Sequence, residues 1–117
     1  MPTLRDLMDA LDARGDVAGA VVLGRDGLLV DSVGVSPADA EHLAAVAPGI
    51  AAAADAVGAA AGDGALTTAV LEFARGLVVV SALSADVLMV VRVAAGADPS
   101  ALVRELRRSR ARLATLV

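Results

Sequence analysis

The chain has 117 residues and a net charge of −4, and 57% of its residues are hydrophobic although only Phe73 is aromatic. This length and composition predict one domain, residues 1–117, with an aliphatic core. The absence of cysteine excludes disulfides, thiolate zinc sites and thiol nucleophiles. Because the first residues lack the pattern of a signal peptide, we expect a cytoplasmic protein.

The charge is distributed unevenly along the chain. Residues 1–103 contain thirteen acidic side chains and five arginines, whereas residues 104–117 contain five arginines and only Glu105 as an acid. An acidic body with one aromatic residue is unsuited to nucleic acid, so we expect no nucleic-acid partner. The late arginines are interpreted as a solvated helix face that complements the helix dipole, with contact to an acidic partner as the alternative.

The first predicted element is a helix that begins at Thr3 and ends by Gly15. Asp6 lies three residues after Thr3 and completes a variant of the capping box. Two short apolar runs follow, at residues 17–23 and 28–33. Between them lies Asp26-Gly27, a strong signal for a tight turn, so the two runs are predicted to form an antiparallel hairpin.

A second helix is predicted from Ser36 to about residue 61. Ser36 is a natural N-cap residue, and Pro37 suits the first helical position. The sequence Gly-Asp-Gly at 62–64 ends the helix.

Three strands are predicted next, at about 66–74, 77–83 and 87–94, and their short connections require antiparallel pairing. The run LVVVSAL is apolar on both faces, as expected for an inner strand. A last helix is predicted with Asp98 as its cap and Leu102, Leu106, Leu113 and Leu116 as its core stripe. The order α-β-β-α-β-β-β-α predicts an α+β fold: a five-stranded antiparallel sheet with helices on both faces.

The second helix is unusual because eleven of residues 44–61 are alanine and Asp55 is the only charge. On a helical wheel, one side can cover the sheet, namely Leu43, Ala47, Ile50, Ala54, Val57 and Ala61. The opposite side carries Ala45, Pro48, Gly49, Ala52, Asp55, Ala56, Ala59 and Ala60. An alanine-biased composition is one explanation. We favour a second protein surface, most simply the same helix in a twofold dimer, with Ala52 at the contact.

A membrane span is not expected for this helix. Pro48, Gly49, Asp55 and Gly58 interrupt it, and alanine favours insertion far less than leucine does.

The sequence contains no convincing catalytic or cofactor site. The stretch GAVVLGRD at 19–26 imitates the start of a P-loop but lacks its Lys-Ser/Thr and leads into a strand. His42, the only histidine, lies near a helix N-terminus with Asp39 and Glu41 and is interpreted as a surface residue, because no serine or partner carboxylate is placed to complete a catalytic site. Glu72 is expected at an outward or edge position. We therefore expect a protein without enzymatic activity, metal or cofactor.

Three stretches together suggest a family: VAGAVVLGRDGLLVDS at 17–32, AEHLAAVAPGIAAA at 40–53 and VLEFARGLVVVSAL at 70–83. In this order they resemble the roadblock/dynein light chain family, including its bacterial MglB-like members. The resemblance implies a homodimer in which the second helix and third strand meet their copies. It also implies a small Ras-like GTPase as partner, which the dimer would activate, scaffold or recruit.

The resemblance implies the position of an interaction surface and no catalytic residues. We expect the dimer or partner interface to include Ala45, Ala52, Asp55, Ala56 and Ala59 on the helix and Thr67 and Thr68 on the strand. Two other readings stay open at this point: a small-ligand sensor domain and a purely structural dimerisation module.

Overall fold

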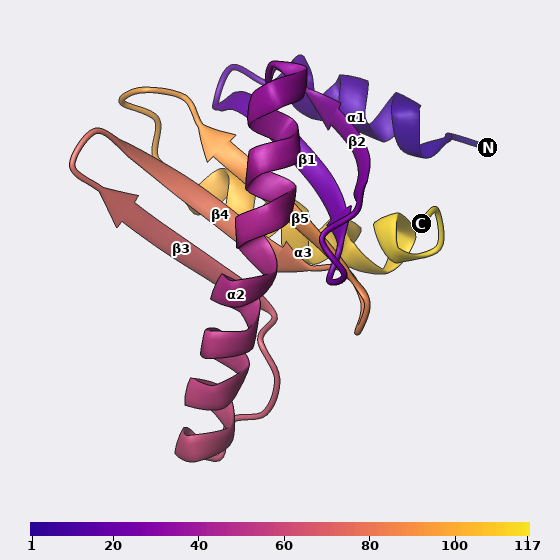
Figure 1. The fold of residues 1–117 in the computed structure, drawn as a ribbon. Coiled ribbons are helices and arrows are strands. Elements are labelled where there is room, and N and C mark those ends of the chain that lie inside the picture. The colour runs from indigo at the N-terminus through magenta and orange to yellow at the C-terminus, as the bar shows by residue number, and fades with distance from the viewer.

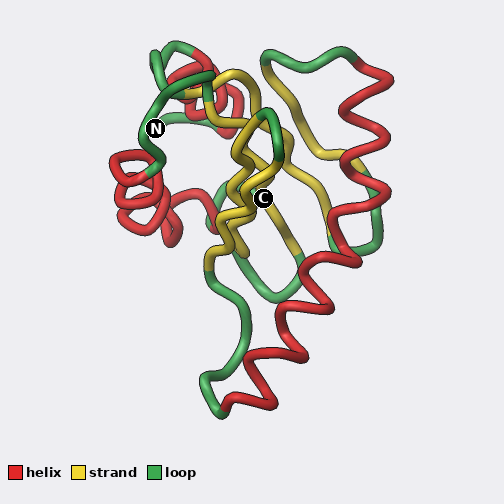
Figure 2. The backbone as a smooth tube through the Cα atoms, turned by 90° about the vertical axis from the view of Figure 1, so that its left-hand side faces the viewer, coloured by secondary structure: helices red, strands yellow, loops and turns green.

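The computed structural model describes all 117 residues and contains one five-stranded antiparallel sheet with three helices (Figure 1). The elements are α1 (Leu4–Asp12), β1 (Val17–Gly24), β2 (Leu29–Val33), α2 (Pro37–Ala61), β3 (Thr68–Phe73), β4 (Gly76–Ala82), β5 (Val87–Val93) and α3 (Ser100–Ala114). The strand order is β2-β1-β5-β4-β3. α2 covers one face of the sheet, and α1 and α3 cover the other (Figure 2). The predicted fold class is confirmed.

Local sequence signals explain most element boundaries. Thr3 and Asp6 form the reciprocal capping box of α1, and the Ser36 hydroxyl accepts a hydrogen bond from the Asp39 N–H at the start of α2. Gly62 ends α2 in the left-handed conformation with φ 76°, which costs glycine little. Gly27 has φ 88° in the β1–β2 turn, as the predicted hairpin requires.

The start of α3 differs from the prediction. Its N-cap residue is Pro99 rather than Asp98, and the helix begins one residue later than expected, at Ser100. Asp98 still supports this end, because its carboxylate accepts hydrogen bonds from the Ser100 N–H and hydroxyl at 3.0 and 2.8 Å. These bonds hold the pKa of Asp98 below its usual value.

Two aliphatic cores lie on opposite faces of the sheet. On one face, Met8 and Leu11 of α1 pack with Leu102 and Leu106 of α3 against inward-facing strand residues. On the other face, a row of buried alanines in α2 packs against Val21, Leu88 and Val90. β4 contributes to both cores, as expected for an inner strand. Leu116 lies beyond the end of α3 and is only half-buried.

The helical wheel was right that Leu43 and Ala47 of α2 cover the sheet, but wrong about Val57 and Ala61 near the end of the helix. The buried row is Ala40, Ala44, Ala47 and Ala51, whereas Val57 is 69% exposed and Ala61 is exposed. The reason is length: at about 1.5 Å per residue, a helix of 25 residues spans about 37 Å. α2 therefore runs past the end of its own sheet after Ala51 (Figures 1 and 2). We call residues 52–61 the arm.

Candidate interaction surface

The edge of the sheet at β3 has no partner within the chain. β3 pairs with β4 only, so the backbone groups along its outer side are free to pair with another strand. The opposite edge, at β2, is different. There Arg5 donates to the Ser32 carbonyl oxygen at 3.2 Å and pairs with Asp31 at 2.8 Å. An arginine side chain therefore occupies part of the β2 edge, and β3 is the more open of the two.

An apolar surface lies beside the β3 edge on the face that carries α2. Leu71 and Val78 are cross-strand neighbours packed against the α2-side core, and both are only partly buried. Phe73 is on the same face by strand alternation and is 57% exposed. α2 crosses the sheet diagonally and leaves this β3–β4 hairpin uncovered (Figure 1).

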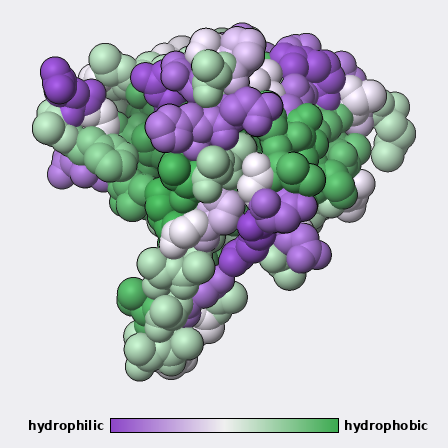
Figure 3. Space-filling view, viewed as in Figure 1, coloured by the Kyte–Doolittle hydropathy of each residue, from purple (hydrophilic) through white to green (hydrophobic).

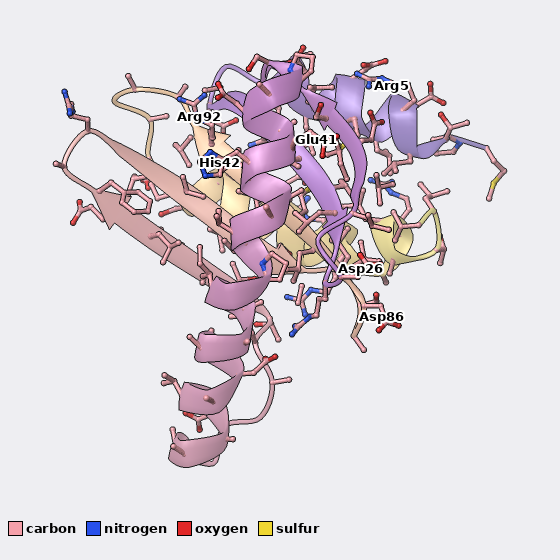
Figure 4. All side chains as sticks on the ribbon, in the orientation of Figure 1. Arg5, Asp26, Glu41, His42, Asp86 and Arg92 are labelled. Carbon is pink, nitrogen blue, oxygen red and sulfur yellow. The ribbon has the colours of Figure 1, made fainter.

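The two flanks of α2 differ in character. Figure 4 shows His42 on the flank toward β4 and β3, and Glu41 on the flank toward β2. At about 100° per residue, Val46 and Val57 lie within about 60° of His42. They are 48% and 69% exposed. Large apolar side chains therefore line the flank that faces the open strand.

The predicted alanines lie elsewhere on the helix. Ala45, Ala52 and Ala59 lie within about 40° of Glu41, and Ala56 faces outward between the two flanks. All four are exposed. Figure 3 shows the arm as a mostly apolar surface with polar atoms along the flank toward β2. The structure thus brings these alanines together on one outward strip, but separates them from the β3 edge.

Asp55 is engaged within the chain. One carboxylate oxygen accepts a hydrogen bond from the Leu66 N–H at 2.7 Å, and the other pairs with the Arg25 guanidinium at 2.6 Å. The hydrogen bond from Leu66, with that from Arg25, holds the pKa of Asp55 below its usual value. Arg25 is not recognisable from the sequence as the partner of Asp55, because the two residues lie 30 positions apart.

The two predicted threonines lie where β3 begins. Thr67 is exposed, and its carbonyl oxygen accepts a hydrogen bond from the Ala82 N–H at 2.9 Å. Thr68 is partly buried, and its hydroxyl lies 3.4 Å from a guanidinium nitrogen of Arg110 in α3. Thr68 therefore belongs to the α3 side of the sheet, whereas Val46 and Val57 lie on α2 on the other side.

The remaining polar residues form no recognisable chemical centre. His42 is exposed and forms no ion pair within 4.0 Å. Side chains that could hold a metal ion do not gather in groups of three or more. Glu72 is exposed on the edge strand, as predicted. Four arginines of α3 are exposed: Arg104, Arg107, Arg108 and Arg112.

α2 is long and apolar enough to cross a membrane, judged by length and composition alone. Its buried alanines nevertheless pack directly on the sheet.

Comparison with known proteins identifies the family. The sequence model of the Roadblock/LC7 domain matches residues 3–92. The chain belongs to the Roadblock/LC7 family. A search of curated protein sequences found no match.

Solved structures of related proteins have the same architecture as this Roadblock/LC7 chain. A Roadblock/LC7 domain from Streptomyces avermitilis is 28% identical, with a TM-score of 0.78 over 97% of this chain and 93% of that one. MglB from Myxococcus xanthus is 18% identical, with a TM-score of 0.76 over 96% and 89% of the two chains. The gliding protein mglB from Thermus thermophilus is 19% identical, with a TM-score of 0.83 over 97% and 87%. The fold expected from the family resemblance is therefore confirmed.

Proposed function

We propose that this Roadblock/LC7 chain is a non-enzymatic cytoplasmic homodimer that binds a small Ras-like GTPase and modulates its nucleotide cycle. The observation that carries the proposal is the unpaired β3 edge beside an apolar helix arm that has no sheet of its own beneath it. Exposed apolar surface next to an open strand edge is typical of a protein–protein interface. Family membership supports a regulatory role in general.

In the proposed dimer, β3 pairs antiparallel with its copy about a twofold axis. An axis perpendicular to the sheet keeps both α2 helices on the same face of the extended sheet. Their valine-bearing flanks then approach each other across the uncovered hairpins. This arrangement removes Val46, Val57 and Phe73 from water without any change in the fold of either chain.

The same arrangement leaves the outward strip free for another partner. Ala45, Ala52, Ala56 and Ala59 point away from both the sheet and the β3 edge, and their small side chains permit close backbone approach. We assign this strip, in both copies, to the GTPase. The twofold dimer offers two symmetry-related binding positions, but a GTPase has no twofold symmetry. One GTPase that lies across the paired helices would cover both positions, so two chains should bind one GTPase.

Calorimetry with a small Ras-like GTPase from the same organism tests the proposal. We expect two chains per GTPase and tighter binding to the GTP-analogue form than to the GDP form, because such switch proteins order their loops around the γ-phosphate. A tenfold difference would correspond to about 1.4 kcal/mol. Equal affinities would refute the switch role, and a dimer that binds neither form would favour a purely structural module.

A further inference from the structure

The arm depends on few contacts because it has no sheet to pack on. No residue between 52 and 61 is buried. The side-chain hydrogen bonds from the arm to the rest of the chain come from the Asp55 carboxylate, which pairs with Arg25 at 2.6 Å and accepts the Leu66 N–H at 2.7 Å. The Asp63 N–H also donates to the Gly58 carbonyl oxygen at 2.8 Å, a bond that caps the end of α2 where the return loop, residues 62–67, begins.

Arg25 is well placed to anchor the arm. It lies in the β1–β2 turn, and its own backbone N–H donates to the Asp86 carbonyl oxygen at 2.8 Å in the β4–β5 turn. Its side chain is 26% exposed, and its Nε is buried without a hydrogen-bond partner. Two adjacent turns at one end of the sheet therefore fix the backbone of the arginine whose guanidinium holds Asp55.

The return loop approaches the arm too closely for a side chain at Gly58. A Cβ added there would overlap the Gly64 carbonyl oxygen. Close backbone approach of this kind requires glycine, so the arm and the loop pack against each other at this point. The loop reaches the sheet through Leu66, which packs against the α2-side core, and the arm reaches the β1–β2 turn through the Asp55–Arg25 pair.

Leu66 comes directly before the two threonines at which β3 begins. The Asp55 carboxylate therefore contacts both parts of the proposed dimer surface: it belongs to the arm, and it accepts the Leu66 N–H at the entry of the edge strand. That entry is also held by the Ala82 N–H bond to the Thr67 carbonyl oxygen and by the packing of Leu66 against the α2-side core. Arg25 and Asp55 touch no second copy in this arrangement. Their effect on assembly must act through the position of the arm and of β3.

We propose that Arg25 and Asp55 are positioning residues that hold the arm and the start of β3 ready for dimerisation, an inference that rests on the proposed function. An arm that must become ordered on binding loses affinity, because ordering costs conformational entropy. The pair should therefore control dimer affinity more than the stability of the fold.

The chain supplies a matched control in the Arg14–Asp16 pair. It has comparable geometry, at 2.8 Å with side chains 31% and 20% exposed. It lies in the α1–β1 connection, away from α2 and β3. A pair that only stabilises the fold should behave like this control.

The experiment compares Asp55→Asn, Arg25→Gln and their double variant with Asp16→Asn. Sedimentation gives each dimer dissociation constant, and hydrogen exchange reports protection of residues 52–66. We expect Asp55→Asn and Arg25→Gln each to weaken dimerisation at least tenfold and to speed exchange in 52–66. The double variant should be little worse than either single one, because both remove the same link. Asp16→Asn should leave the dissociation constant unchanged.

Three outcomes have distinct meanings. A wild-type dimer that Asp55→Asn leaves equally tight overturns the positioning role, as does equal weakening by Asp55→Asn and Asp16→Asn. A wild-type chain that is monomeric at tens of micromolar refutes the proposed dimer itself. In that case exchange alone tests the link: unchanged protection of residues 52–66 in Asp55→Asn refutes it, and faster exchange supports it.

Discussion

Val57→Glu provides the sharpest test of the proposed dimer. Val57 lies on the arm, on the flank toward β3, and is 69% exposed within one chain. A glutamate there meets water in the monomer, and helix propensity differs between the two residues by only a few tenths of a kcal/mol. The fold of the single chain should therefore tolerate the change.

In the dimer the same change is costly. Complete burial of a valine side chain is worth about 1.5–3 kcal/mol, so covering the exposed part contributes roughly 1–2 kcal/mol per copy. Desolvation of an unpaired carboxylate adds about 1–3 kcal/mol or more per copy. With two copies at the twofold, the dimer loses at least about 4 kcal/mol, equivalent to about a thousandfold in the dissociation constant.

Sedimentation over a concentration series measures this loss, and circular dichroism melts at low concentration check the fold. Ala52→Glu is the matched control, because it adds the same charge to the same arm on the flank toward β2. Sequence alone placed Ala52 at the twofold contact, but in the structure it lies away from β3. We expect Ala52→Glu to remain dimeric and to weaken GTPase binding. A Val57→Glu dimer as tight as wild type would refute the assignment of this flank, and so would dissociation caused by Ala52→Glu alone.

Three further predictions concern the interior, the pH dependence and the chemistry of the chain. The Ser81 hydroxyl is buried without a hydrogen-bond partner, so Ser81→Ala should raise the free energy of unfolding by about 1 kcal/mol in urea titrations; a loss of similar size would reveal a partner for the hydroxyl. The hydrogen bond from Arg14 lowers the pKa of Asp16 from its usual 3.8, so the stabilisation is present above that value and disappears as the pH falls through the lowered pKa. As the pH is lowered, the urea midpoint of unfolding should therefore fall less steeply for Asp16→Asn than for wild type. Parallel curves of midpoint against pH for the two proteins would contradict this. The purified chain should hydrolyse no nucleotide, and His42→Ala should leave the effect on a GTPase unchanged; hydrolysis that disappears in His42→Ala would contradict a non-enzymatic role.

Local chemistry allowed much of the fold to be predicted. The capping box at Thr3, the Ser36 cap, the Asp26-Gly27 turn and the Gly62 stop each act within a few residues, so each is readable from the sequence and each is present in the structure. The position of β4 inside the sheet also follows from its apolar residues on both faces.

The interaction surface could be predicted only in part. An alanine-rich helix signals close packing, but periodicity does not show where the sheet beneath it ends. The signal that the helix extends past the sheet is its length: α2 has 25 residues, whereas the strands have five to eight. Such strands span only about 16–27 Å. That mismatch leaves Val57 in water and creates the arm.

Contacts between distant segments were decided only by the tertiary structure. The sequence by itself determined the order of elements, their caps and turns, and the absence of cysteine, because these depend on residue type and near neighbours. Strand order placed β3 at the edge, and the meeting of two turns placed Arg25 beside Asp55. Such partners depend on how the whole chain closes around its two cores, and no short-range pattern encodes that closure.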